Sequence, residues 1–258
     1  MMPSVFISHG APNRVMGQSP AKKFLESFAE SINTPKAIVI FSAHWFSKEL
    51  QITAETLEAE HGSTVQFLDA YNINYHSKQP KWLSERISDL LEENNQRYTV
   101  CHRALDHGAW SVLMLCYPNA EIPVIGMSLP VYDDFHNYFV LGKMLKVLRK
   151  EDILIIGSGS ATHNLSTLSH SKTAPDWAIE FVRWLQDRVD HNDYEALTNL
   201  YQSHPFSRMA HPTFDHYVPL LVAAGAAAEE PNELIHDSYE YGSLNNSCFK
   251  FGSASGLS

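Results

Sequence analysis

Four short apolar runs constrain the fold of this chain more than any other feature of its sequence. They are rich in valine and isoleucine, and their apolar residues follow one another without alternating with polar ones. This pattern is typical of strands that are covered on both faces, as in a largely parallel sheet. The runs span residues 5–7, 37–41, 122–127 and 153–156.

Helical patterns separate these runs, so the sequence predicts an α/β fold with a mostly parallel central sheet flanked by helices. Asp133 or Asp134 can cap the third predicted helix, and residues 247–251 could form an edge strand. No repeat or linker interrupts the pattern, so we expect a single domain over residues 1–258. Apolar residues recur at helical spacing within 20–32, 80–93, 135–148, 176–189 and 217–228.

Charge and cysteine content exclude several classes of protein. The formal net charge of −10 argues against nucleic-acid binding, which requires a basic face. Cys101, Cys116 and Cys248 form no close pair, so we expect neither a disulfide framework nor a thiolate zinc site, and we expect a reducing cytoplasmic location. No signal-peptide pattern is present and no apolar run is long enough to span a membrane, so a membrane partner is not expected.

Histidines follow three of the predicted strands. The runs lead into His9, His44 and His163. The carboxyl ends of parallel strands share one edge of a sheet, and ligands bind there. Neutral imidazoles are good ligands for zinc and iron. A single histidine after a strand is more often a structural or surface residue, but three such endings favour a shared metal site at the carboxyl ends of the strands.

Two further histidines are candidates for the same site. His107 precedes the apolar run 112–116, where it could face a pocket or lie exposed in the first turn of a helix. His216 lies at the start of a predicted buried helix, where it could point into the site or simply pack. Residues 58–79 form the least regular segment, either an excursion near the site or a surface loop. Ser158 lies between two glycines, but it lacks the spacing of a GxSxG nucleophile elbow.

Five motifs together resemble the 4,5-DOPA extradiol dioxygenase family of the class III extradiol ring-cleavage dioxygenases. Their order and spacing match over nearly the whole chain, and YGSL at 241–244 also fits. The motifs are SHGAP at 8–12, SAHWF at 42–46, DHGAW at 106–110, GSATHNL at 159–165 and DHYVPLL at 215–221.

This resemblance implies a single catalytic α/β domain with one non-haem divalent metal per chain. It implies that His9, His44 and His216 are metal ligands, that His163 is a fourth ligand or an acid/base, and that His107 faces the substrate. Better-known class III enzymes complete their site with a glutamate. A site made only of histidines has no charged ligand. It can bind Zn(II) as well as Fe(II), the metal that ring cleavage needs.

The sequence departs from the family pattern at two places. Residues 60–67 stand where members often carry Gly-Gly-Phe-Pro, in a loop expected to shape the substrate pocket. Ser166 stands where a basic residue is common, which removes a possible anchor for a substrate carboxylate.

The resulting functional expectation is an extradiol dioxygenase that opens a DOPA-like catechol with O2, in which His163 moves protons and His107 hydrogen-bonds the substrate. We expect a small aromatic diol and O2 as partners, and a monomer or small homo-oligomer. Two alternatives stay open: a zinc-dependent hydrolase on the same histidines, and a catalytically silent metal-binding relative.

Overall fold

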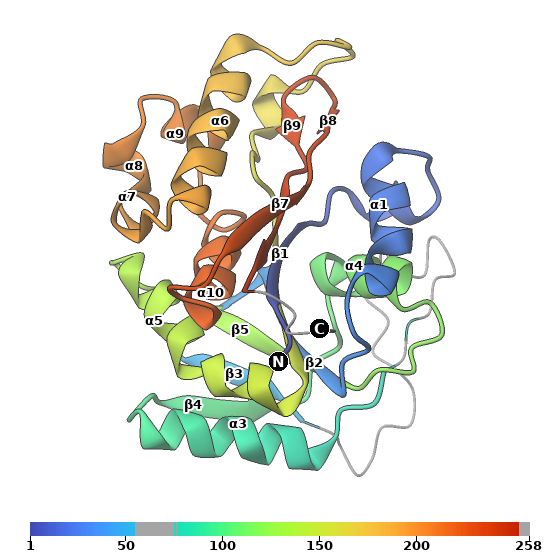
Figure 1. Ribbon diagram of the computed structural model, residues 1–258, viewed down its shortest axis with the longest axis vertical. Helices are drawn as coiled ribbons and strands as arrows, with labels where there is room; N and C mark the ends of the chain where they lie inside the picture. The colour runs from blue at the N-terminus through green and yellow to red at the C-terminus, as the bar shows by residue number, and fades with distance from the viewer. Residues whose placement is uncertain (55–74, 76, 253–258) are drawn as a thin grey trace.

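An eight-stranded sheet lies at the centre of the computed structural model, which describes residues 1–54, 75 and 77–252 (Figure 1). The sheet order is β4-β3-β5-β2-β6-β1-β10-β7, and the four strands β5, β2, β6 and β1 run parallel to their neighbours within that group. β3 pairs antiparallel with β5, and β10 antiparallel with β1. The bounds are β1 Ser4–Ser8, β2 Ala37–Ser47, β3 Leu50–Thr53, β4 Tyr98–Cys101, β5 Val124–Pro130, β6 Ile153–Gly159, β7 Asn232–His236 and β10 Cys248–Phe251.

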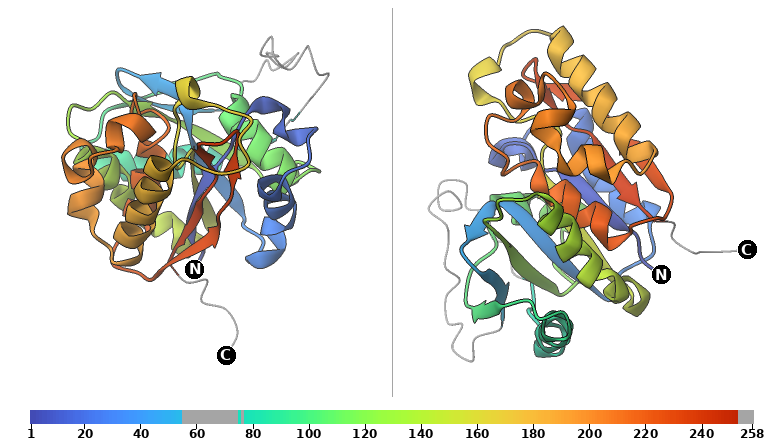
Figure 2. Two further views of the ribbon diagram at one scale, coloured as in Figure 1. Left: turned by 90° about the horizontal axis from the view of Figure 1, so that it is seen from above. Right: turned by 90° about the vertical axis from the view of Figure 1, so that its left-hand side faces the viewer.

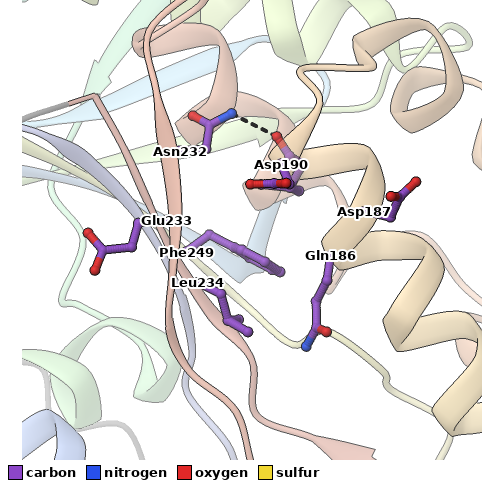
Figure 3. Close-up of a pocket in the computed structure, with 8 residues that line it drawn as sticks. Gln186, Asp187, Asp190, Asn232, Glu233, Leu234 and Phe249 are labelled. Carbon is purple, nitrogen blue, oxygen red and sulfur yellow. Dashed lines mark hydrogen bonds between the residues drawn. The ribbon is translucent and has the colours of Figure 1, made fainter.

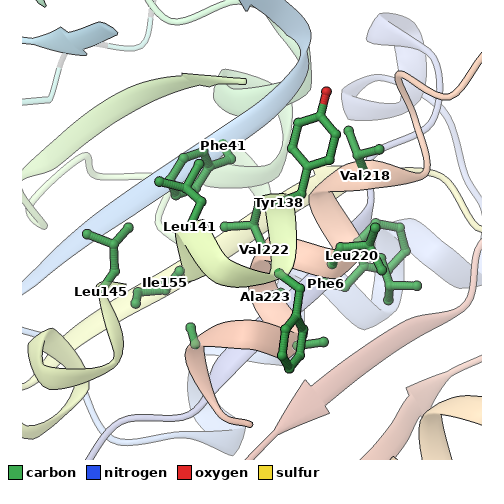
Figure 4. Packing of buried hydrophobic residues seen from close by; sticks show 14 of the residues in the cluster. Phe6, Phe41, Tyr138, Leu141, Leu145, Ile155, Val218, Leu220, Val222 and Ala223 are labelled. Carbon is green, nitrogen blue, oxygen red and sulfur yellow. The ribbon is translucent and has the colours of Figure 1, made fainter. Parts of the chain in front are cut away.

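Helices cover both faces of this sheet, which explains the continuous apolar runs. Successive side chains of a strand point to opposite faces. In β2, Ile38 and Ile40 pack on the face covered by α1 and α4, whereas Val39 and Phe41 pack on the face covered by α5 and α10 (Figures 2 and 4). The expected α/β fold with a mostly parallel central sheet flanked by helices is therefore confirmed.

A helix lies in each of the five predicted ranges, with bounds that agree to within four residues, whereas α4 and α7 to α9 were not predicted. Both α1 and α5 end four residues early, and a 3-10 segment follows each of them, Ala29–Ser31 and Lys146–Glu151. Asp134 accepts a hydrogen bond from the His136 amide (2.8 Å) ahead of α5. The bounds are α1 Pro20–Phe28, α3 Lys81–Glu93, α4 His107–Cys116, α5 His136–Met144, α6 Asp176–Asp190, α7 Tyr194–Thr198, α8 Leu200–Ser203, α9 Ser207–Ala210 and α10 Val218–Ala226.

The strand predicted at 247–251 is present as β10, but its predicted place at the edge of the sheet was wrong. β10 lies between β1 and β7, and β7 forms that edge of the sheet. β7 carries exposed and half-buried residues such as Glu233 and Leu234, so no apolar run marked it in the sequence. The short β3 and β4 and the hairpin of β8 (Tyr239–Glu240) and β9 (Leu244–Asn245) were likewise not predicted. The irregular segment 58–79 falls largely outside the described residues.

Glycines in β6 let α10 lie directly on the sheet. A Cβ atom on Gly157 would stand 2.0 Å from the Pro219 carbonyl oxygen, and one on Gly159 would stand 2.2 Å from that of His216. The Ser160 amide also donates a hydrogen bond to the His216 carbonyl (2.9 Å). This close approach brings the start of α10, and His216 with it, to the carboxyl end of β6.

We expect Gly157→Ala to destabilise the protein by about 1–3 kcal/mol, the usual cost of overpacking a filled core. The new methyl group meets backbone rather than a flexible side chain, so α10 must move. Urea unfolding measures the change. Gly17→Ala is the control, because its Cβ would lie 3.7 Å or more from its neighbours. Equal unfolding midpoints for the two variants would contradict the expectation.

No helix among the described residues is long and apolar enough to cross a membrane.

Candidate metal centre

Five histidines from five segments meet at the carboxyl edge of the parallel strands. His9 directly follows β1, His44 lies in β2 where its pairing with β5 is irregular, and His163 follows β6. His107 is the first residue of α4, and His216 lies two residues before α10. These are the histidines that the sequence singled out, and the structure brings all of them together.

Ring contacts define how the five side chains lie. The His9 ring centroid is 5.0 Å from that of His44 and 5.2 Å from that of His216, and the last two are 4.8 Å apart. His107 lies against His44, with centroids 3.9 Å apart. His163 stacks on His216 almost face to face, at 3.4 Å with 7° between the ring planes.

Two neighbouring sets of side chains, with no member in common, could hold a metal ion within the described part of the chain. One is His9, His44 and His107, and the other is His163, Asp215 and His216; in each set the candidate ligand atoms lie within 4.8 Å of one another. His9 and His216 are buried, whereas the other three histidines are half-buried. The cluster therefore has a closed inner side and a partly open outer side that a small molecule could reach.

Hydrogen bonds fix which nitrogen of His216 is free. Its Nδ1 lies 2.5 Å from Oδ2 of Asp215. Burial opposes ionisation of Asp215, but its hydrogen bonds to His216 and Thr213 outweigh burial and hold its pKa below the usual range. The carboxylate can only accept, so Nδ1 of His216 carries the hydrogen and Nε2 keeps its lone pair. A carboxylate behind a histidine is a common support for a metal ligand.

His9, His44, His107 and His163 are neutral near pH 7. Burial, and then the neighbouring imidazoles, lower the pKa of His9 well below its ordinary value and that of His44 to about 3. Burial likewise lowers the pKa of His163 to about 4 and also lowers that of His107. A neutral imidazole can bind a metal or accept a proton, so both kinds of chemistry are available here.

The donor set fits a divalent transition metal. Nε2 of His9 and Nε2 of His44 are 3.1 Å apart. Two nitrogens that each lie about 2.1 Å from one metal ion are about 3.0–3.4 Å apart. A cation bound by both lone pairs would replace the proton that otherwise has to lie between them. Neutral nitrogen ligands suit Fe(II) and Zn(II).

Sequence analysis missed the residues that support the histidines. Asp215 was noted only as part of a motif, although an acidic residue directly before a histidine is a usable signal. Ser42, Asp106 and Ser158 form further hydrogen bonds around the cluster. His211, assigned no role, is fully buried and lies beside the cluster, with its Nε2 2.9 Å from the Ala161 carbonyl oxygen, which can only accept.

A separate hollow of about 270 Å³ lies between α6 and the β7 edge of the sheet (Figure 3). Its lining includes Asp187, Asp190 and Glu233 but none of the clustered histidines. Asp187 is paired with Arg188 and Glu233 with Lys250, so these two carboxylates already have cationic partners. The hollow has no part in the histidine site.

The fold and the gathered histidines define an α/β protein with a candidate metal centre at the carboxyl edge of its sheet. The family model of the catalytic LigB subunit of aromatic ring-opening dioxygenase matches residues 2–252. The chain belongs to this family of ring-opening dioxygenases, and the expectation of an extradiol ring-cleavage oxidoreductase is confirmed.

Individual relatives agree with this assignment. The chain is 38% identical to a Beta vulgaris protein named 4,5-DOPA dioxygenase extradiol, over 96% of each chain. It is 31% identical to an Escherichia coli (strain K12) protein of the same name, over 95% of this chain and 92% of the relative. A crystal structure of an uncharacterized protein from Escherichia coli K12 matches with a TM-score of 0.83 at 30% identity, covering 98% of this chain and all of that one.

Proposed function

We propose that residues 1–258 form a single catalytic domain that opens the ring of a DOPA-like catechol with O2, using one divalent metal held by His9, His44 and His216. The observation that carries this proposal is the convergence of these three rings, each within 5.2 Å of the others. His216 is preferred to His107 as the third ligand because it is buried and Asp215 fixes its free nitrogen.

The metal is Fe(II) for turnover, and Zn(II) can occupy the same ligands. Bound there, ferrous iron would supply the Lewis acidity and electron transfer that ring cleavage by O2 requires. None of the three ligands is a carboxylate, so the site has no negative ligand that would repel an anionic catechol.

His163 is the acid/base of the proposed reaction. Its ring stacks face to face on that of His216, which supports a place beside the metal ligands. Because burial lowers its pKa to about 4, His163 is unprotonated at neutral pH, as a group that takes a proton from a catechol hydroxyl has to be. The same nitrogen would return this proton to the ring-opened product.

His107 holds the substrate in the proposed site. It is half-buried at the start of α4 and lies against His44 on the open side of the cluster. A neutral imidazole there can donate one hydrogen bond to a catechol oxygen or to dioxygen.

Exposed apolar residues on the segment that carries His163 and on the segment hydrogen-bonded to it support an aromatic substrate. Leu165 and Met209 are 61% and 44% exposed, and the Asn164 amide donates to the Met209 carbonyl (2.7 Å), which holds the two segments together. Ser166 offers no cation at this place. The names of the relatives support a catechol of the DOPA kind.

The setting of the enzyme is also part of the proposal. All three cysteines are free thiols, which supports a reducing cytoplasm. The acidic net charge of −10 supports small-molecule rather than nucleic-acid partners. A monomer or small homo-oligomer stays a prediction.

Anaerobic reconstitution tests the proposed function. The protein is loaded with Fe(II) or, separately, Zn(II), and DOPA and simpler catechols are added with and without O2. We expect a yellow ring-opened product only with Fe(II), catechol and O2 together. Stoichiometric metal without product on any catechol would overturn the proposal in favour of a silent relative, and O2-independent hydrolysis with Zn(II) in favour of a hydrolase.

A further inference from the structure

A chain of buried hydrogen bonds connects the first turn of α4 to two of the clustered histidines. Nδ1 of His9 lies 3.0 Å from the Ser158 hydroxyl oxygen. That hydroxyl lies 2.5 Å from the Gly108 carbonyl oxygen. Ser158 is in β6 and fully buried, so no water competes for its single hydrogen.

The direction of each hydrogen bond follows from the number of hydrogens available. A carbonyl oxygen can only accept, so the Ser158 hydroxyl donates its one hydrogen to Gly108. Towards His9, the same oxygen can then only accept. Nδ1 of His9 must carry the hydrogen, and Nε2 keeps the lone pair that faces His44.

The first turn of α4 holds the acceptor in place. Asp106 precedes the helix, and its carboxylate accepts from the Gly108 amide (2.9 Å) and from the Ser42 hydroxyl (2.5 Å). The Ser42 oxygen in turn accepts from the His44 amide (3.2 Å). The same turn therefore supports both His9 and His44.

Only glycine fits at the centre of this arrangement. A Cβ on Gly108 would stand 2.5 Å from the Ser42 hydroxyl oxygen and 3.0 Å from Cδ2 of His44. The helix start consequently lies close enough to β2 and β6 for its carbonyl to reach Ser158.

We propose that Ser158 is a positioning residue that sets the tautomer of His9, so that Nε2 of His9 is permanently free for a metal ion. Serine replaces the carboxylate or backbone carbonyl that more often stands behind a metal-binding histidine. Ser158 acts only through His9, and its direction is set by the start of α4. The expected effect on metal binding rests on the proposed metal site. The tautomer of His9 itself is a property of the metal-free protein.

The first test is nitrogen-15 NMR of the imidazoles in the metal-free protein, with the His9 signals assigned from their loss in His9→Ala. We expect Nδ1–H in the wild type and a mixture of tautomers in Ser158→Ala. Ser4→Ala is the matched control, because Ser4 is also buried in the sheet and donates to a carbonyl oxygen, that of Ala223 (2.7 Å). Ser4 begins β1, whereas His9 follows the other end of that strand. An unchanged His9 tautomer in Ser158→Ala would overturn the proposal.

The second test is Zn(II) affinity, measured by competition with a chelator. We expect Ser158→Ala to weaken the Kd by about 10–100-fold, as loss of such supports typically does, while Ser4→Ala leaves it unchanged. Ser158→Ala within twofold of the wild type would contradict the inference. A wild-type protein that binds no Zn(II) would instead contradict the proposed metal site, and the NMR result would still decide the tautomer.

Discussion

Replacing His216 with Ala is expected to remove metal binding. The affinity for Zn(II) should fall by more than the roughly 10–100-fold that the loss of a supporting hydrogen bond costs, because a ligand itself is lost. The half-buried Asp215 would also lose the partner that its Oδ2 atom has at 2.5 Å. Chelator competition measures the Kd, and Fe(II)-dependent turnover should disappear with it.

His107→Ala is the decisive comparison, because His107 and His216 each belong to a set of side chains that could hold a metal ion. His107 belongs to the other set of candidate ligands, together with His9 and His44. If it binds substrate as proposed, its removal should leave the Zn(II) affinity nearly unchanged. Loss of metal from His107→Ala with retention in His216→Ala would reverse the two assignments.

Replacing His163 with Ala is expected to lower kcat by roughly 10²–10⁴-fold, the usual contribution of a positioned acid/base. The metal should remain bound, because the stacked ring of His163 is a neighbour of His216 and not one of the three proposed ligands. Oxygen consumption by the Fe(II)-loaded variant with saturating catechol measures the effect, and metal content is determined on the same sample.

The control for this prediction is His170→Ala, since His170 lies a few residues further along the chain and its side chain is exposed. We expect its kcat to equal that of the wild type. Near-normal turnover by His163→Ala would refute the acid/base role. Loss of metal from that variant would make His163 a fourth ligand instead.

The central strands could be predicted from the sequence because burial on both faces leaves a local mark. The runs around Val5, Val39 and Ile155 are visibly apolar in the sequence, whichever strands they pair with. β7 and the hairpin of β8 and β9 carry no such mark. Their pairing depends on residues far away in the chain, so β10 was assigned to the edge that β7 occupies.

The histidines could be predicted because they combine a distinctive side chain with a strand end or a family motif. Their supports could not. Nothing in the sequence distinguishes Ser158 from any other buried residue of a strand. Its role is visible only in the folded structure, where the Gly108 carbonyl oxygen lies 2.5 Å from its hydroxyl. Such a contact joins β6 to the start of α4, and no spacing in the sequence records it. Asp215 is the exception, because it adjoins its partner.

The segments that meet at the carboxyl edge of the sheet are far apart in the sequence, and this separation determines when the histidine cluster can form during protein synthesis. His9 directly follows β1, which comes before the other strands of the sheet in the sequence, whereas His216 precedes α10, more than 200 residues later, and rests on β6. Contacts between such distant segments form late, because the loop between them must close first. A ribosome-bound chain that lacks α10 would hold only part of the ligand set. A metal ion held by all three proposed ligands would consequently bind only after α10 has docked on β6.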